Sequence, residues 1–208
     1  MKDHRLPTNL PTDLDAILAG IWEAFEVGVR EAGHPFHTPV VATAGQADCD
    51  ARVVVLRRVS PDHRELVFHT DARAPKVRLL QACHTTAWVF YDPAGKVQVR
   101  AKGNTVVHRG DAVAEAAWAR TRLMSRRCYL AEPAPSTPSD TPSSGLPPAL
   151  VERSPTAAES EVGFVNFAVC VTEVVRLDWL QLAARGHRRA AFVWNDGAAG
   201  WRGHWLTP

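Results

Sequence analysis

The sequence predicts a mainly β fold with flanking helices (α+β), an antiparallel barrel that carries its helices on the outside. Two observations lead to this prediction. Most segments with regular patterning are short runs rich in Val, Thr and aromatic residues, each bounded by turn residues. Their order is one helix, five strands, a helix, a loop, a helix and three strands, which lacks the regular strand–helix alternation of a parallel sheet. We expect a single domain over residues 1–208.

The first element is an amphipathic helix over residues 12–32, because apolar side chains recur there at helical spacing. Thr12 can cap its start, while Gly33 and Pro35 end it.

Strands are predicted wherever Val, Thr and aromatic residues are concentrated between turn residues. Turn signals at 60–62, 92–95 and 195–197 favour hairpins and therefore antiparallel pairing. The predicted strands are Thr38–Ala44, Ala51–Val59, Glu65–Thr70, Thr85–Tyr91, Lys96–His108, Phe164–Leu177, Arg189–Trp194 and Trp201–Leu206.

Three further helices are predicted at Ala74–Cys83, at Gly110–Leu130 with Asp111 as its cap, and at about Pro148–Glu161. Residues 131–148 are nearly all Pro, Ser, Thr, Gly or Ala, so this loop cannot be a core element. It is either a flexible linker or an ordered functional loop.

Composition excludes several classes of protein. A net charge of +2 with dispersed basic residues argues against a nucleic-acid partner. No apolar run approaches the roughly 18 residues of a membrane span, and the N-terminus lacks the apolar core of a signal peptide, so we expect a cytoplasmic protein. Four cysteines without a CxxC pair, and nine histidines without an HxxxH or HxH pair, predict no metal site.

Four polar patterns are candidates for a site, and each also has a plain structural interpretation. Arg52 and Arg57 bracket a Val-rich run; they would face opposite sides unless the strand bulges or ends, and solvated arginines are the alternative to an anion site. Further on, Phe68-His69-Thr70-Asp71 ends a strand just before Lys76, which suits a phosphate at a helix start. Helix capping is the alternative there.

The other two patterns lie on later strands. Gln98 shares a strand face with Arg100 and Lys102, and its amide offers both a donor and an acceptor. Trp179 precedes Arg185, His187 and Arg189, whose alternation would place three basic side chains on one strand face, suited to an anionic planar ligand. A solvent-facing strand and a solvated basic turn are the respective alternatives.

Taken together and in this order, the motifs resemble the pyridoxamine 5′-phosphate oxidase family, and in particular its less characterised FMN-binding branch. The resemblance covers roughly residues 15–208 and includes Gln98-Val99 with Gly103, and the Arg185-x-His187-x-Arg189 pattern. It implies a split β-barrel of the FMN-binding type, with FMN at the interface of a homodimer. The implied flavin contacts are Arg52, Leu56, Arg57, His69, Thr70, Lys76, Gln98, Trp179 and Arg189, with Arg57 alternatively facing the substrate.

The resemblance also implies substrate contacts at Arg126, Arg185 and His187. Arg185 and His187 would orient the substrate, and His187 could move a proton. Arg122 and Leu130 stand where the family's oxidases have Tyr and Ser, and only Ser143-Ser144 could stand for its Gln-Ser-Ser flavin contact. These departures argue against oxidation of pyridoxamine phosphate itself, whereas Arg185 and His187, which resemble the oxidases' substrate-side pair, argue for it. The expectation is an FMN-dependent oxidoreductase acting on a small molecule; the alternatives are a non-catalytic flavin- or haem-binding protein and a dimeric scaffold.

Overall fold

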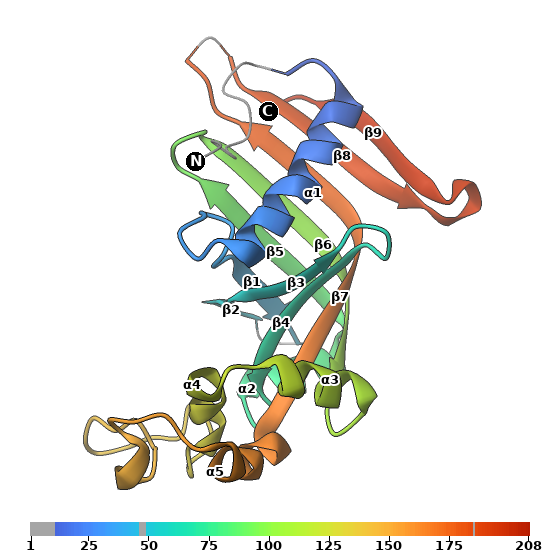
Figure 1. Ribbon diagram of the computed structural model, residues 1–208. Coiled ribbons are helices and arrows are strands. Elements are labelled where there is room, and N and C mark those ends of the chain that lie inside the picture. Colours follow the sequence, from blue (N-terminus) through green and yellow to red (C-terminus); the bar gives the residue numbers. More distant parts are fainter. Residues whose placement is uncertain (1–10, 46–48, 185) are drawn as a thin grey trace.

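The structure is a computed structural model that describes residues 11–45, 49–184 and 186–208 (Figure 1). The described strands form one sheet in which every pairing is antiparallel, which confirms the predicted fold class. The strands are β1 (Val40–Ala44), β2 (Cys49–Val53), β3 (Leu56–Ser60), β4 (Glu65–Asp71), β5 (Thr85–Asp92), β6 (Val97–His108), β7 (Phe167–Gln181), β8 (Arg188–Asn195) and β9 (Gly200–Leu206).

The main path of the sheet runs β2-β1-β5-β6-β7-β4-β3, so β2 and β3 lie at its two ends. Only Val54 and Val55 separate these two strands in the chain. The predicted single strand Ala51–Val59 is therefore wrong: its first half pairs with β1 and its second half with β4. The strand breaks because the two halves pair with different strands, which lie in different directions.

Strand β7 is the longest and joins the two parts of the sheet. Its first half pairs with β4, its second half pairs with β8, and β6 runs along its other edge. The register with β6 shifts between Lys102 and Gly103. A Cβ atom at Gly103 would collide with the carbonyl oxygen of Glu173, so this position requires glycine.

Helix α1 (Leu14–Arg30) packs against β3 and β9 with its apolar face. Its N-cap is Asp13, whose Oδ1 accepts from the amides of Asp15 at 2.9 Å and Ala16 at 3.3 Å, rather than the predicted Thr12. A carboxylate accepts these hydrogen bonds, and its negative charge also interacts favourably with the positive end of the helix dipole.

The predicted helix Gly110–Leu130 is in fact three shorter elements: α3 (Ala112–Arg120), α4 (Leu123–Arg126) and a 3₁₀ turn, η1 (Arg127–Leu130). The backbone is extended at Thr121 and Arg122, which ends the first helix. Asp111 caps α3 as predicted.

The predicted helix Pro148–Glu161 is likewise split. It becomes the 3₁₀ turn η2 (Pro148–Leu150) and α5 (Ala157–Glu161), because Pro155 disfavours helical backbone before it. The remaining elements are α2 (Pro75–Ala82), η3 (Val162–Asn166) and η4 (Asp196–Ala198). Helices α3, α4 and α5 gather at the end of the sheet opposite the β8–β9 hairpin (Figure 1).

Two groups of buried apolar side chains stabilise this arrangement. The larger fills the barrel under α1 and includes Phe25, Phe68, Trp88 and Phe90. The smaller lies under α3 and consists of Val67, Ala114, Trp118, Tyr129, Phe167 and Val169. No helix in the described part of the chain has the length and apolar character needed to cross a membrane.

Candidate functional site

A pair of positive side chains lies where β4 meets α2. Lys76, in the first turn of α2, donates a hydrogen bond from Nζ to Thr70 Oγ1 at 3.2 Å. Burial lowers the pKa of Lys76, and the positive charge of Arg52 lowers it further. An anion bound between the two cations would relieve this repulsion.

Arg52 is held in place from β2. Its Nη1 donates to the Val41 carbonyl at 3.1 Å and to Thr43 Oγ1 at 2.9 Å, and its Nη2 pairs with the exposed Asp50 at 2.5 Å. Helix α2 has no side-chain cap, so the positive end of its dipole adds to the two cations. The structure brings Arg52, Thr70 and Lys76 together, in an arrangement that suits a phosphate, while their contact with FMN stays a prediction.

His69 stands between two cavities. Its ring packs edge-on against Phe167, with 4.9 Å between ring centroids. Burial, and then the positive charge of Arg57, lower its pKa to about 4. His69 is therefore neutral at neutral pH, and one ring nitrogen can donate a hydrogen bond while the other accepts.

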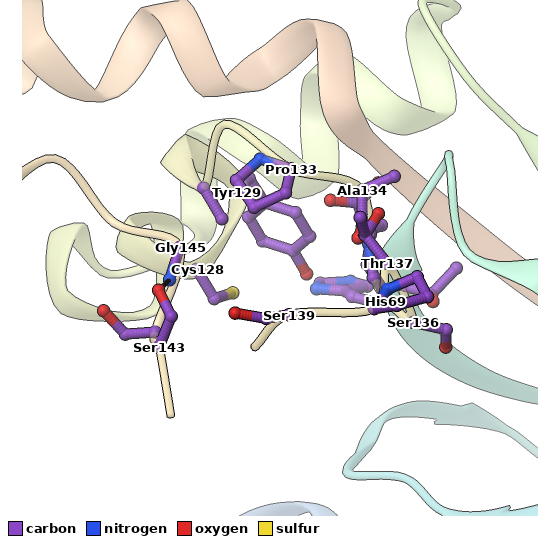
Figure 2. A pocket seen from close by; sticks show the side chains of 16 residues that line it. His69, Cys128, Tyr129, Pro133, Ala134, Ser136, Thr137, Ser139, Ser143 and Gly145 are labelled. Carbon is purple, nitrogen blue, oxygen red and sulfur yellow. Dashed lines mark hydrogen bonds between the residues drawn. The ribbon is translucent and has the colours of Figure 1, made fainter. Parts of the chain in front are cut away.

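The first cavity, of about 590 Å³, lies between His69 and the Pro/Ser-rich loop. Figure 2 shows the Tyr129 phenol and the His69 ring pointing toward one another inside it, with Cys128 beside them. Burial raises the pKa of the Tyr129 hydroxyl and that of the Cys128 thiol. All three side chains are uncharged at neutral pH, so the cavity is polar but neutral on this side.

The loop that covers this cavity is anchored. Arg73, paired with Asp71 at 2.8 Å, donates to the carbonyls of Ala131 at 2.9 Å and Glu132 at 3.0 Å. Of the two alternatives for residues 131–148, the structure therefore favours an ordered loop. Ser143 and Ser144 line the cavity, as does Gly145.

A second cavity, of about 870 Å³, opens on the other side of His69. Its walls come from the end of α1, from β3 and β4, and from α3 and α4. Arg57 and Arg122 line it together with Ser125, whereas Leu56 is buried, 1 % exposed, in the core. Its backbone amide donates to the His37 carbonyl at 2.9 Å.

The predicted residues of the later strands are spread over the sheet. Gln98 shares the less buried face of β6 with Arg100 and Lys102, as predicted. Trp179 is 2 % exposed and packs in the core, and its side chain lines neither cavity around His69.

Arg189 pairs with a buried carboxylate. Asp178, 4 % exposed, accepts hydrogen bonds from Arg189 Nη2 at 2.9 Å and from Arg100 Nη2 at 2.8 Å. Burial alone would raise the pKa of Asp178, but the hydrogen bonds from Arg189 and Arg100 lower it overall.

The predicted row of three basic side chains on one strand is wrong for His187. This residue lies in the turn before β8, where its Nδ1 accepts from the Ala183 amide at 3.1 Å. The strand begins only at Arg188, so alternation does not apply to His187. Arg185 lies outside the described residues.

Arg126 has a structural role. It is 8 % exposed and donates to the carbonyls of Trp118 at 2.7 Å and Thr121 at 3.0 Å, to Ser160 Oγ at 3.1 Å and to Glu161 Oε1 at 2.6 Å. Four of its five N–H donors are used. These bonds join α3, α4 and α5, and a substrate phosphate would have to compete with them; the predicted contact of Arg126 with such a phosphate stays a prediction.

Sequence reasoning did not single out Tyr129, Cys128, Arg30 or Arg120. Tyr129 and Cys128 fall in a segment predicted to be plain helix, and no local pattern distinguishes them. Arg30 and Arg120 each occupy the last turn of a helix, where a basic residue is ordinary. No group of three or more His, Cys, Asp or Glu side chains suited to a metal occurs within residues 11–45, 49–184 and 186–208.

Comparison with known proteins gives one family match. Residues 21–109 match the family model described as "Pyridoxamine 5′-phosphate oxidase, FMN-binding domain". No curated protein matches the chain.

Solved structures match nearly the whole chain. A pyridoxamine 5′-phosphate oxidase-related, FMN-binding protein from Nostoc punctiforme PCC 73102 has a TM-score of 0.69 at 22 % identity, over 91 % of this chain and 96 % of that one. PhzG from Burkholderia lata 383, in complex with tetrahydrophenazine-1-carboxylic acid, has a TM-score of 0.66 at 18 % identity, over 99 % and 98 %. Both are similar to this chain in fold.

Proposed function

We propose that the protein is an FMN-dependent oxidoreductase, on the premise that residues 21–109 match the family model of the pyridoxamine 5′-phosphate oxidase FMN-binding domain. The single observation that carries the proposal is the cation pair at the β4–α2 junction. Lys76 and Arg52 are close enough for one to lower the pKa of the other, and Thr70 adds a hydroxyl. This donor set fits the phosphate of FMN.

Three further residues are proposed as contacts of the flavin. Gln98, on the less buried face of β6, would pair with the flavin pyrimidine edge through its amide. His69, neutral at neutral pH, would donate or accept one hydrogen bond beside the ring system. Arg189, held by Asp178, would supply a fixed positive charge. FMN, when bound, would accept a hydride from the substrate.

We propose that the substrate is an anionic planar molecule other than pyridoxamine 5′-phosphate. Arg126 is occupied by protein acceptors, and Arg122 and Leu130 replace the family's Tyr and Ser. Arg57 would then orient the substrate from the second cavity. The compound bound to PhzG in its solved structure is a ring carboxylic acid, which is a molecule of the proposed kind.

We also propose that the protein is a homodimer. Large apolar side chains are exposed on neighbouring strands of the sheet, among them Tyr91 on β5, 48 % exposed, and Val106 on β6, 56 % exposed. A second copy would cover them across a two-fold axis. Light scattering of the FMN-loaded protein tests this, and a monomer carrying FMN would contradict it.

The competing candidate is a non-catalytic flavin- or haem-binding protein, and the structural role of Arg126 is the observation that favours it. An absorbance spectrum of the purified protein, with the released cofactor identified by mass, tests the cofactor. Flavin reduction by a panel of anionic ring compounds, followed as loss of the flavin absorbance, then tests turnover. Pyridoxamine 5′-phosphate is included, with weak or absent hydrogen peroxide release as the expected result.

A further inference from the structure

A third cavity, of about 470 Å³, lies between the start of α2 and the tip of the Pro/Ser-rich loop. The loop tip is defined here as residues 134–138, and all five of them line both this cavity and the first one. Figure 2 shows Ser136 and Thr137 at the end of the first cavity where the His69 ring lies. The loop tip is therefore a wall shared by two cavities, and a movement of the tip toward α2 widens the first cavity.

The loop tip is held only by bonds within the loop. Thr137 donates twice to the Ala134 carbonyl, from its backbone amide at 3.2 Å and from Oγ1 at 2.8 Å. In the part of the chain that the structure describes, no hydrogen bond joins residues 134–138 to another element. The fixed points of the loop lie at its ends, where the Glu132 amide donates to the Gly145 carbonyl at 3.0 Å. The tip can therefore move without breaking a bond to the rest of the protein.

The α2 side of the third cavity is basic. Arg73 and Arg78 line it, and no Asp or Glu side chain does. Arg73 is already bonded to Asp71 and to two loop carbonyls. The side chain of Arg78 is exposed and has no hydrogen-bond or ion-pair partner among the described residues. A phosphoryl group on a hydroxyl of the loop tip would supply the missing counter-charge, because a guanidinium can bind two phosphate oxygens at once.

We propose that Thr137 is a phosphorylation site, and that its phosphoryl group binds Arg78 and draws the loop tip toward α2. Thr137 is exposed, so a kinase can reach its hydroxyl. Pro138 follows it directly, which is the order that proline-directed protein kinases select and which Ser136 lacks. This regulation goes beyond the proposed function and does not depend on a bound flavin.

The reaction is a transfer of the γ-phosphoryl group from a nucleoside triphosphate. The bond between the γ-phosphorus and the bridging oxygen breaks, a bond between phosphorus and Thr137 Oγ1 forms, the nucleoside diphosphate leaves, and the hydroxyl proton passes to the kinase. The product carries a charge of about −1.5 to −2 at pH 7. Phosphorylation also removes the Oγ1 donor to the Ala134 carbonyl, so the turn at the loop tip loses one of its two bonds.

Treatment of the full-length protein with a proline-directed Ser/Thr kinase and MgATP tests the site itself. Mass spectrometry of the digested product should find phosphate on Thr137. An unmodified Thr137, under conditions in which the kinase fully modifies a standard peptide substrate, would overturn the proposal.

Phosphothreonine introduced at position 137 during translation tests the contact with Arg78. Phosphothreonine at position 141 is the matched control, because Thr141 is also exposed and followed by proline but lines neither the first nor the third cavity. The second pKa of the phosphate, ordinarily about 6, should be lower at position 137 than at 141 by about half a unit or more, because the guanidinium favours the dianion. Phosphorus NMR measures both values.

Variants assign the difference to one arginine. Arg78→Gln should abolish it, whereas Arg202→Gln, which removes an exposed arginine on β9, should leave it unchanged. Equal phosphate pKa values at the two positions, or a difference that persists in Arg78→Gln, would overturn the docking of the phosphoryl group.

Thiol labelling reports on the movement of the loop tip. Cys128 lines the first cavity, whereas Cys49 on β2 lines none of the three cavities. Protein with phosphothreonine at position 137 should react faster with iodoacetamide at Cys128 than the unmodified protein, with the rate at Cys49 unchanged. Peptide mass spectrometry measures both rates. An unchanged rate at Cys128 would overturn the movement of the tip, and no outcome of these experiments bears on flavin binding.

Discussion

Lys76 Nζ donates a hydrogen bond to Thr70 Oγ1 at 3.2 Å, and this contact ties the end of β4 to the first turn of α2. The two residues are six apart in sequence, and Arg52 from β2 lies close enough to lower the pKa of Lys76. The cation pair at the β4–α2 junction is therefore built by three elements, β2, β4 and α2. It gives the first prediction its physical basis.

Lys76→Ala should weaken FMN binding by roughly tenfold or more, because a charge-assisted hydrogen bond contributes about 1.5–3 kcal/mol and each decade in affinity is about 1.4 kcal/mol. Fluorescence titration with FMN measures the change. Arg78→Ala, which removes an exposed cation from the same helix, is the control and should bind FMN as the wild type does. Wild-type affinity in Lys76→Ala would remove this residue from the phosphate site.

Arg126→Lys should lower the free energy of unfolding by about 2–4 kcal/mol, because several of the buried hydrogen bonds cannot be made by an ammonium group. Denaturant unfolding measures this loss. Arg127→Lys, a neighbouring arginine that bonds only the carbonyls of residues 150, 151 and 153, should cost less. A stable Arg126→Lys variant that lost affinity for anionic ligands would instead return this arginine to the substrate site.

Asp178→Asn should destabilise the β6–β7–β8 region by about 1–3 kcal/mol, because one buried carboxylate orients both Arg100 and Arg189. The same variant should bind FMN more weakly, since Arg189 loses its fixed position. Denaturant unfolding and FMN titration separate the two effects. Asp62→Asn, in an exposed turn, serves as the matched control. Loss of stability with unchanged FMN affinity would show that Arg189 does not contact the flavin.

The stability of the flavin-free protein should fall between about pH 6.5 and pH 4 because of His69. Its pKa is about 4 in the folded chain and 6.5 as the ordinary value, so only the unfolded state takes up the proton in this range. The stabilisation is therefore complete above pH 6.5 and is lost on acidification, by roughly 2 kcal/mol at about pH 5. In His69→Gln the free energy of unfolding should fall by roughly 2 kcal/mol less between pH 6.5 and pH 5 than in the wild type. Urea unfolding at these two pH values measures the difference. His63→Gln, in an exposed turn, should behave as the wild type.

Gly103→Ala should destabilise the protein strongly, by about 3 kcal/mol or more, because the added methyl group meets the Glu173 backbone and not a movable side chain. Thermal unfolding measures the loss. Gly33→Ala is the control, since no atom lies within 4 Å of a Cβ built there. An unchanged melting temperature for Gly103→Ala would show that the β6–β7 bulge can shift without cost.

Much of the fold was predictable because its signals are local. The strands Glu65–Thr70 and Thr85–Tyr91 agree with β4 and β5 to within one residue, as period-two patterning and flanking turns define them. The break in the chain after Val53 could not be predicted. The sequence showed only that Arg52 and Arg57 would face opposite sides unless the strand bulged or ended between them. The break arises because β2 pairs with β1 and β3 pairs with β4, and local residue patterns do not show which strands will pair.

Part of the arrangement around the candidate site was predictable as well. Thr70, Lys76 and Arg52 were singled out from motifs at strand and helix ends, and the structure brings them together; their contact with a phosphate stays a prediction. The role of Arg126 was not found, because two of its acceptors lie 34 and 35 residues further along the chain. The second cavity was foreseen only in part for a similar reason: Arg57 and Arg122 were singled out, but Arg30 and Arg120 come from two other segments, where each alone is an ordinary surface residue.

The two-residue connection between β2 and β3 also sets a mechanical limit. These strands are the two ends of the main sheet path, and Val54 and Val55 tether them covalently. Three residue steps from Val53 to Leu56 reach at most about 10 Å, at ~3.3–3.6 Å each. The linked ends of β2 and β3 can therefore separate only within that span. Arg52 and Arg57 stand on either side of the tether, five residue steps apart, so their Cα atoms stay within about 18 Å of one another wherever the rest of the two strands moves.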